Sequence, residues 1–282
     1  MKNVVLNNGT KMPKKLAEKT VRANLWANLW LALLLPAMSC SVLAQPNKSV
    51  PSDPAMDVFA LNNQADSFDK SEQHERAIEL LKRAVRLAPE SAATIRNLGV
   101  VYLNANQPLL AIKAFEQSLL LKANDAETYF DLGLGYLGCE KYESAVEALK
   151  RANQLTPGSS GATYNALGSA YAHLGRTEDA FAALREAVRL NPDFAAAHAN
   201  LGMLQLTAGQ RAEASNSLEK AARLAPNPAE ASFALGVLFL IRHDRTSALA
   251  QYNVLKNLSP ELADLLYNTI YDGAYVVDLK QK

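Results

Sequence analysis

The feature of this sequence that most constrains its fold is an internal repeat with a period of 34 residues. The string Leu98-Gly99-Val100-Val101-Tyr102 returns in related form at 132–136, after 34 residues, and at 167–171, after a further 35. Shorter copies begin at positions 201 and 235. A period of this length is typical of arrays in which each unit packs only on its neighbours. We therefore divide residues 58–262 into six units, with Ser160 as a single inserted residue: 58–91, 92–125, 126–159, 161–194, 195–228 and 229–262.

The residues that the units share predict a pair of helices in each, and hence an all-α fold. The Leu-Gly-x-x-Tyr spacing places its residues on one stripe of the first helix, and the glycine lets a second helix approach closely. An alanine twelve residues after each glycine position marks the second helix, and a proline ends that helix in five of the six units. The structural positions are Leu98, Gly99, Tyr102, Ala111, Leu132, Gly133, Tyr136, Ala145, Leu167, Gly168, Tyr171, Ala180, Leu201, Gly202, Ala214, Leu235, Gly236 and Ala248. An amphipathic segment follows Pro260, so we assign 263–282 to a capping helix and a tail.

This pattern resembles the tetratricopeptide repeat (TPR). The resemblance covers about 205 of the 282 residues, although Gln64 and Ala65 replace Leu-Gly in the first copy. It implies a right-handed α-solenoid of stacked helix-turn-helix hairpins. It also implies a protein that binds other proteins without catalysis and without a cofactor.

In this family the first helices of the repeats line a concave groove that holds an extended peptide or a partner helix. The contacting positions are the second, fifth, ninth, twelfth and thirteenth of each repeat. Carried over to this chain, they predict a largely apolar groove for an apolar peptide or helix, which includes Arg96, Val100, Asn104, Glu127, Phe130, Leu134, Asn165, Ser169, His173, Met203, Phe233 and Val237. We expect Phe130 and Phe233 to be exposed aromatic anchors. The alternative for the leucines at the twelfth position, such as Leu137 and Leu206, is burial between adjacent repeats.

Some family members bind a partner's terminal carboxylates through Asn at the ninth position. Here none of the ninth positions is Asn, so a clamp of that kind is not expected: they are Asp66, Val100, Leu134, Ser169, Met203 and Val237.

The N-terminal segment 1–44 has the pattern of an export signal. Residues 11–22 are basic, residues 25–35 are mostly apolar, and small residues follow, so we expect cleavage between Ala44 and Gln45. Two alternatives remain: an uncleaved anchor at 24–44 and lipidation of Cys40. Residues 45–57 contain three prolines and predict an extended linker. The signal predicts an exported domain, on the periplasmic or extracellular side, with possible attachment to a membrane through the N-terminus.

Charge and motif content favour neither nucleic-acid binding nor catalysis. The chain carries a net charge of +1, and without its first 44 residues 23 positive side chains face 27 negative ones, so phosphate neutralisation is not expected. Gly133, Gly135 and Gly138 match G-x-G-x-x-G, but they fall inside a predicted helix instead of after a strand. The four histidines lack an i, i+4 partner, so we predict no metal site, no cofactor and no enzyme.

Three functions fit this pattern. The first is an exported, non-catalytic adaptor that holds an apolar segment of a partner in its groove. The second is a membrane-tethered assembly factor for an envelope machine, similar to the pilotin-like lipoproteins of pili and secretion systems. The third is a structural scaffold that binds copies of itself.

Overall fold

A computed structural model describes residues 54–158, 160–225 and 227–271, and within these ranges the chain is helical without a strand. The first helices of the repeats, called A helices here, are α2 (Pro54–Lys70), α4 (Ala92–Asn104), α6 (Ala126–Gly138), α8 (Gly161–His173), α10 (Ala195–Thr207) and α12 (Pro228–Ile241). The second, or B, helices are α3 (His74–Leu87), α5 (Pro108–Leu121), α7 (Tyr142–Leu155), α9 (Thr177–Leu190), α11 (Arg211–Leu224) and α13 (Arg245–Leu258). A final helix, α14, spans Pro260–Tyr271. The all-α fold of stacked helical hairpins is confirmed.

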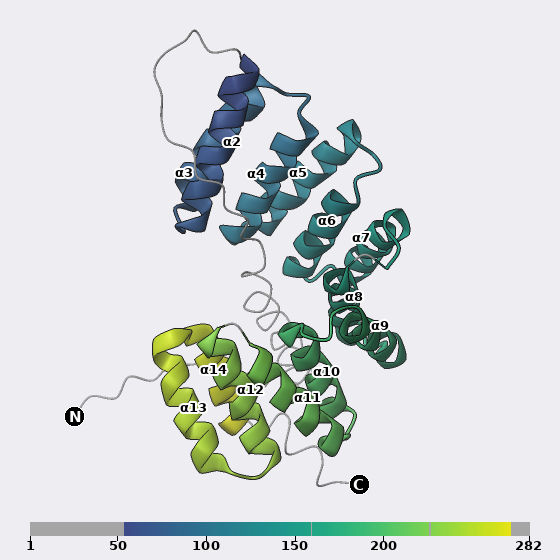
Figure 1. Cartoon of the computed structure of the whole chain (residues 1–282), viewed down its shortest axis with the longest axis vertical. Helices are drawn as coiled ribbons and strands as arrows, with labels where there is room; N and C mark the ends of the chain where they lie inside the picture. Colours follow the sequence, from purple (N-terminus) through teal and green to yellow (C-terminus); the bar gives the residue numbers. More distant parts are fainter. Residues whose placement is uncertain (1–53, 159, 226, 272–282) are drawn as a thin grey trace, which may run out of the picture.

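Each A helix pairs with the B helix that follows it, and each B helix also contacts the next A helix. Successive A helices touch from α2 to α10, whereas no two successive B helices make contacts of that extent within the described residues. Because one edge of the stack is therefore shorter than the other, the array curves toward its A helices. Figure 1 shows this curved stack, with α7 and α9 on the outer side of the bend.

The glycine of each repeat is the point at which two helices come closest. A Cβ atom on Gly168 would lie 2.5 Å from Leu184 Cγ, and one on Gly99 would lie 2.5 Å from Phe115 Cε1, so any side chain there would push the helix pair apart. The partner lies 16 residues after the glycine in both repeats, which is why the 34-residue pattern needs glycine here. Of the predicted structural positions, Tyr136 and Leu235 are half-buried and the others are buried.

The turn between helices A and B has the same backbone form in every repeat. One residue, at an equivalent position in each, has positive φ, and only two of the six are glycines: Glu72, Asn106, Glu140, Gly175, Gly209 and His243. The left-handed conformation costs a non-glycine residue some free energy, so packing of the hairpin must impose it. His243 accordingly lies in the turn of the sixth repeat.

The capping helix replaces part of the last B helix. In the sixth repeat the notch at Gly236 is filled by Leu266 of α14, whose Cδ2 would lie 2.4 Å from an added Cβ. The residue at the usual spacing, Tyr252, is half-buried and packs its ring on Tyr267, with centroids 5.5 Å apart. Helix α14 contacts both α12 and α13, as the A helix of a seventh repeat would.

The N-terminal boundary of the array differs from the prediction. Helix α2 begins at Pro54, so the last four residues of the expected linker 45–57 are helical. The predicted cleavage site at Ala44 and Gln45 and the lipidation candidate Cys40 lie outside the described residues, as does the tail after Tyr271. Among the described helices, none has the length and apolar character needed to cross a membrane.

Candidate protein-binding face

The residues predicted to bind a partner lie on the A helices, on a surface that we call the A-helix face. In repeats 2 and 3 this face is partly open: Glu127 is exposed, and five residues are half-buried, namely Arg96, Val100, Asn104, Phe130 and Leu134. His173, at the end of α8, is also half-buried. The structure does not test whether any of these side chains binds a partner, so that role stays a prediction.

The same face is closed in repeats 4 to 6, which contradicts the expectation of an exposed anchor there. Phe233 is 5% exposed, and both Met203 and Val237 belong with it to one large hydrophobic cluster. Asn165 and Ser169 are buried as well. Met203, Phe233 and Val237 are core residues because apolar groups on successive repeats pack together and are removed from contact with water. The leucines at the twelfth position follow the alternative reading, since Leu137, Leu206 and Leu240 are buried and Leu103 is half-buried.

A charged cluster joins repeats 2 and 3 on the open part of the face. Arg96 of α4 donates through Nε to Asp131 Oδ2 of α6 at 2.6 Å, and it also pairs with Glu127. Burial raises the pKa of Asp131 to about 6, although the Arg96 guanidinium opposes this shift. Sequence reasoning missed Asp131, yet its separation of 35 residues from Arg96 is a signal, because other inter-repeat pairs have the same separation.

Hydrogen bonds between asparagine side chains 35 residues apart connect other A helices, and we call these two pairs the amide ladders. Asn97 donates to Asn62 at 2.9 Å, and Asn200 donates to Asn165 at 2.9 Å. The first pair is open to solvent, whereas both residues of the second are 1% exposed. These bonds fix the offset between neighbouring repeats, and the buried pair has no water to replace a lost partner.

An aromatic stack closes the middle of the face. The ring of Tyr142 lies parallel to that of His173, with centroids 4.3 Å apart. Burial lowers the pKa of His173 to about 4, so its imidazole is neutral near pH 7, and burial raises the pKa of Tyr142 to about 12. Ser169 Oγ, on the same helix as His173, is buried without a hydrogen-bond partner. The polar side chains of the fourth repeat on this face are thus largely shielded from water.

A second buried polar group lies in the sixth repeat. Glu230, in the first turn of α12, is 6% exposed, and its Oε1 atom has no hydrogen-bond partner. Burial raises the pKa of this carboxyl to about 7. This burial was not predictable from the sequence pattern, because a glutamate in a first helical turn usually faces solvent.

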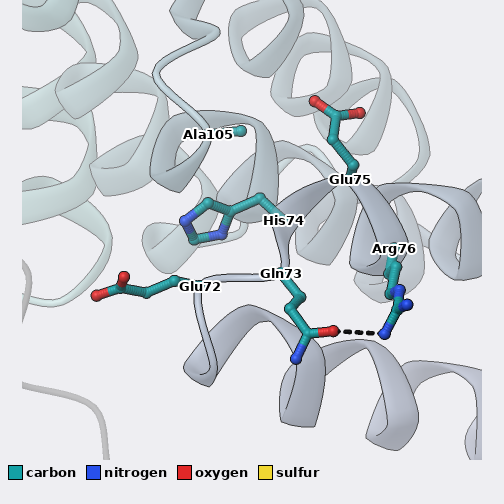
Figure 2. A pocket seen from close by; sticks show the side chains of 6 residues that line it. All are labelled: Glu72, Gln73, His74, Glu75, Arg76 and Ala105. Carbon is teal, nitrogen blue, oxygen red and sulfur yellow. Dashed lines mark hydrogen bonds between the residues drawn. The ribbon is translucent and has the colours of Figure 1, made fainter.

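A shallow depression at the end of the array offers no comparable site. It lies at the turn between α2 and α3, has a volume of about 360 Å³, and is lined by Glu72, Gln73, His74, Glu75, Arg76 and Ala105. Figure 2 shows the hydrogen bond from Arg76 to Gln73, which is 2.6 Å long, among the side chains that line this depression. His74 pairs with Asp69 at 2.7 Å. Two of the side chains that line the depression, Arg76 and His74, therefore already have partners within the chain.

The described residues hold no cluster of His, Cys, Asp and Glu that could bind a metal ion. Gly133, Gly135 and Gly138 lie within α6, so the G-x-G-x-x-G string packs helices instead of following a strand. Cys139 is half-buried at the end of α6, and burial raises the pKa of its thiol. This leaves the thiol protonated and poorly nucleophilic at neutral pH.

The array is similar to several solved TPR structures. pilF of Pseudomonas aeruginosa is 19% identical with a TM-score of 0.60, covering 76% of this chain and 99% of that one, which shows a shared fold. A thermophilic TPR protein of Thermus thermophilus is 28% identical with a TM-score of 0.56, covering 66% of this chain and all of the other.

Two curated proteins match parts of the sequence. The BBSome complex member BBS4 homolog of Drosophila melanogaster is 31% identical over 101 residues, which are 36% of this chain and 21% of that protein. The anaphase-promoting complex subunit CDC16 of Saccharomyces cerevisiae is 32% identical over 120 residues, 40% of this chain and 14% of that one. The chain thus spans less than a quarter of the length of either relative.

Family models match most of the array. Models described as tetratricopeptide repeat match residues 62–128, 126–159 and 199–263, and a model described as TPR repeat matches 168–209. Together they cover more than half of the chain and overlap all six units of the internal repeat. The chain belongs to the tetratricopeptide-repeat family.

Proposed function

We propose that this protein is an exported adaptor that holds an apolar segment of a partner protein on the A-helix face of repeats 2 and 3. The TPR fold supports a role as a protein-interaction scaffold, and proteins of this kind are generally non-catalytic. The finer proposal, the place and chemistry of binding, depends on which part of the face is open.

The observation that carries the proposal is the contrast in burial along the face. Val100 and Leu103 of α4 and Phe130 and Leu134 of α6 are half-buried on neighbouring helices, so they form an apolar strip that water still reaches. Charged and polar groups of Arg96, Glu127 and Asn104 border it. An apolar strip with a polar rim is the usual composition of a binding surface.

The test is capture of partners by the full-length protein and by its Phe130→Ala variant from extracts of the native host. A captured partner is then produced separately and its affinity measured by calorimetry. Loss of an anchoring aromatic ring weakens binding by about 1–3 kcal/mol, and we expect a loss in that range.

Leu120→Ala is the matched control. Leu120 is 86% exposed on the B helix α5, and α5 contributes Leu109, Leu110 and Leu121 as further exposed leucines. Equal binding by wild type and Phe130→Ala, with both variants folded by circular dichroism, would contradict the proposal. Loss of binding in Leu120→Ala alone would place the interface on α5.

Two other proposals are separated by simple measurements. A membrane-tethered assembly factor requires a retained or lipidated N-terminus, which the mass of the mature protein from its host reveals. A self-associating scaffold requires a concentration-dependent molar mass in light scattering. The four exposed leucines of α5 are the surface on which we would test self-association.

A further inference from the structure

The interface between the fifth and sixth repeats, which contains Glu230, is equivalent to the interface between the second and third repeats. There, Arg96 pairs with Glu127, 31 residues later, and with Asp131, 35 residues later. One guanidinium thereby pairs with two carboxylates of the next A helix. This triad provides a template for the same positions elsewhere in the array.

At the equivalent positions of repeats 5 and 6 the acid is kept and the base is missing. Glu230 lies 31 residues after Ala199, and Ala234 lies 35 residues after Ala199. Ala199 therefore stands in place of Arg96, and Ala234 stands in place of Asp131. Glu230 is nevertheless buried, and its Oε1 atom accepts no hydrogen bond. Burial raises the pKa of Glu230 to about 7 with no charged neighbour contributing, so no side chain takes over the part of Arg96.

The two A helices on either side of this interface supply no cationic side chain for Glu230. Successive A helices contact each other from α2 to α10, but α10 and α12 do not approach to that extent within the described residues. Neither helix carries another Asp, Glu, Lys or Arg. The positive end of the α12 dipole is therefore what offsets the carboxylate, and it supplies a fraction of a charge.

We propose that the A-helix face between α10 and α12 binds the guanidinium of an arginine in the partner segment, with the Glu230 carboxylate as its acceptor, at the interface where Ala199 stands in place of the arginine of the second repeat. The bound guanidinium would play the part that the Arg96 side chain plays between repeats 2 and 3, three interfaces earlier in the array. A charge-assisted hydrogen bond in this shielded place is stronger than one in water. The inference rests on the proposed function, because it names the chemistry of one residue in the bound segment.

The experiment uses two synthetic probes that differ in one group. Both are short, capped, apolar peptides with a single central residue, which is arginine in one and citrulline in the other. Citrulline has nearly the shape of arginine and no charge. Binding to the full-length protein is measured by calorimetry, and we expect the arginine peptide to bind about tenfold more tightly.

Three variants assign that preference to the site. Glu230→Gln keeps the size of the side chain and removes its charge, so the preference for arginine should disappear. Ala199→Arg places a guanidinium at the spacing that Arg96 has to Glu127, so it should compete with the probe and also remove the preference. Glu213→Gln is the matched control, because Glu213 is an exposed glutamate in the first turn of the B helix α11, and it should leave the preference unchanged.

Each outcome decides the inference. Equal binding of the two peptides by wild type, no measurable binding at millimolar concentration, or an unchanged preference in Glu230→Gln would overturn it. If Ala199→Arg does not fold, Glu230→Gln and Glu213→Gln still give the answer. Phe130→Ala separates this inference from the proposed function: it should weaken binding of the captured partner while leaving the arginine preference of the probes intact.

Discussion

The first three repeats and the last three carry the same residues at several equivalent positions and use them differently. Asn62 and Asn165, Glu127 and Glu230, and Phe130 and Phe233 are each separated by 103 positions. The members in the first half are half-buried or exposed, and those in the second half are buried.

The neighbours of these residues account for the difference. Repeat 2 presents the large, charged Arg96 where repeat 5 presents Ala199, and Arg96 keeps 19% of its side chain in solvent while bridging to the next helix. In the second half the neighbouring side chains are small and apolar, so the residues of the A-helix face pack into the hydrophobic cluster that extends from Leu137 to Ile270. A repeat position is thus not by itself a surface or a core position. The size and charge of the residues around it decide which it becomes.

The largest expected contrast concerns the two phenylalanines. Phe233→Ala removes a buried ring from the core and should lower the free energy of unfolding by about 3–5 kcal/mol. Phe130→Ala removes a half-buried ring, so we expect about half that loss. Urea unfolding followed by circular dichroism measures both, and equal losses would show that the two halves are packed alike.

A smaller contrast, with a defined pH dependence, concerns the two glutamates. The folded chain raises the pKa of Glu230 from 4.5 to about 7, so it binds this proton more tightly than the unfolded chain does. Stability from this group is therefore present at pH 4 and is lost as the pH rises through 7. We expect Glu230→Gln to increase the free energy of unfolding by about 2 kcal/mol at pH 8 and to change it little at pH 4.

Glu127→Gln is the comparison for that measurement, and its effect should stay within about 1 kcal/mol because the side chain is largely solvated. Asp131, whose pKa is raised to about 6, contributes the same pH dependence in wild type and in Glu230→Gln, so the difference between these two proteins isolates Glu230. A Glu230→Gln curve parallel to that of wild type between pH 4 and pH 8 would disprove the assignment.

The smallest contrast concerns the two amide ladders. Asn165→Ala leaves the buried Asn200 without its acceptor and should cost about 1–3 kcal/mol. Asn62→Ala removes the acceptor of an exposed Asn97, which water can replace, so the cost should be below about 1 kcal/mol. Thermal unfolding by calorimetry ranks the two variants, and a greater loss in Asn62→Ala would reverse the interpretation of the two halves.

Much of the architecture could be predicted from the sequence because the repeat encodes it locally. Gly99 and Gly168 each require a close partner helix, and the residue 16 positions later fills that space in the structure. The last repeat departs from the rule, since Leu266 of α14 fills the notch at Gly236. Nothing in the pattern indicates this exchange, because it depends on how the capping helix docks.

The candidate site was predictable in part. The family positions identified the A-helix face, including Arg96 and Phe130, but they also assigned Phe233 to an exposed anchor that proved to be buried. They did not identify Asp131 as a partner of Arg96 or Glu230 as a buried acid. Both depend on contacts between repeats, which a pattern within one repeat does not contain.

The sequence by itself determined the helices, their pairing and the number of repeats, because these follow from the spacing of apolar and small residues along each unit. The tertiary structure alone decided which parts of the A-helix face are open. That outcome depends on side chains about 31 and 35 residues apart meeting across neighbouring repeats, where Arg96 bridges to the next helix and Ala199 does not reach it. Burial is a property of such encounters, and it changes when one partner changes size or charge.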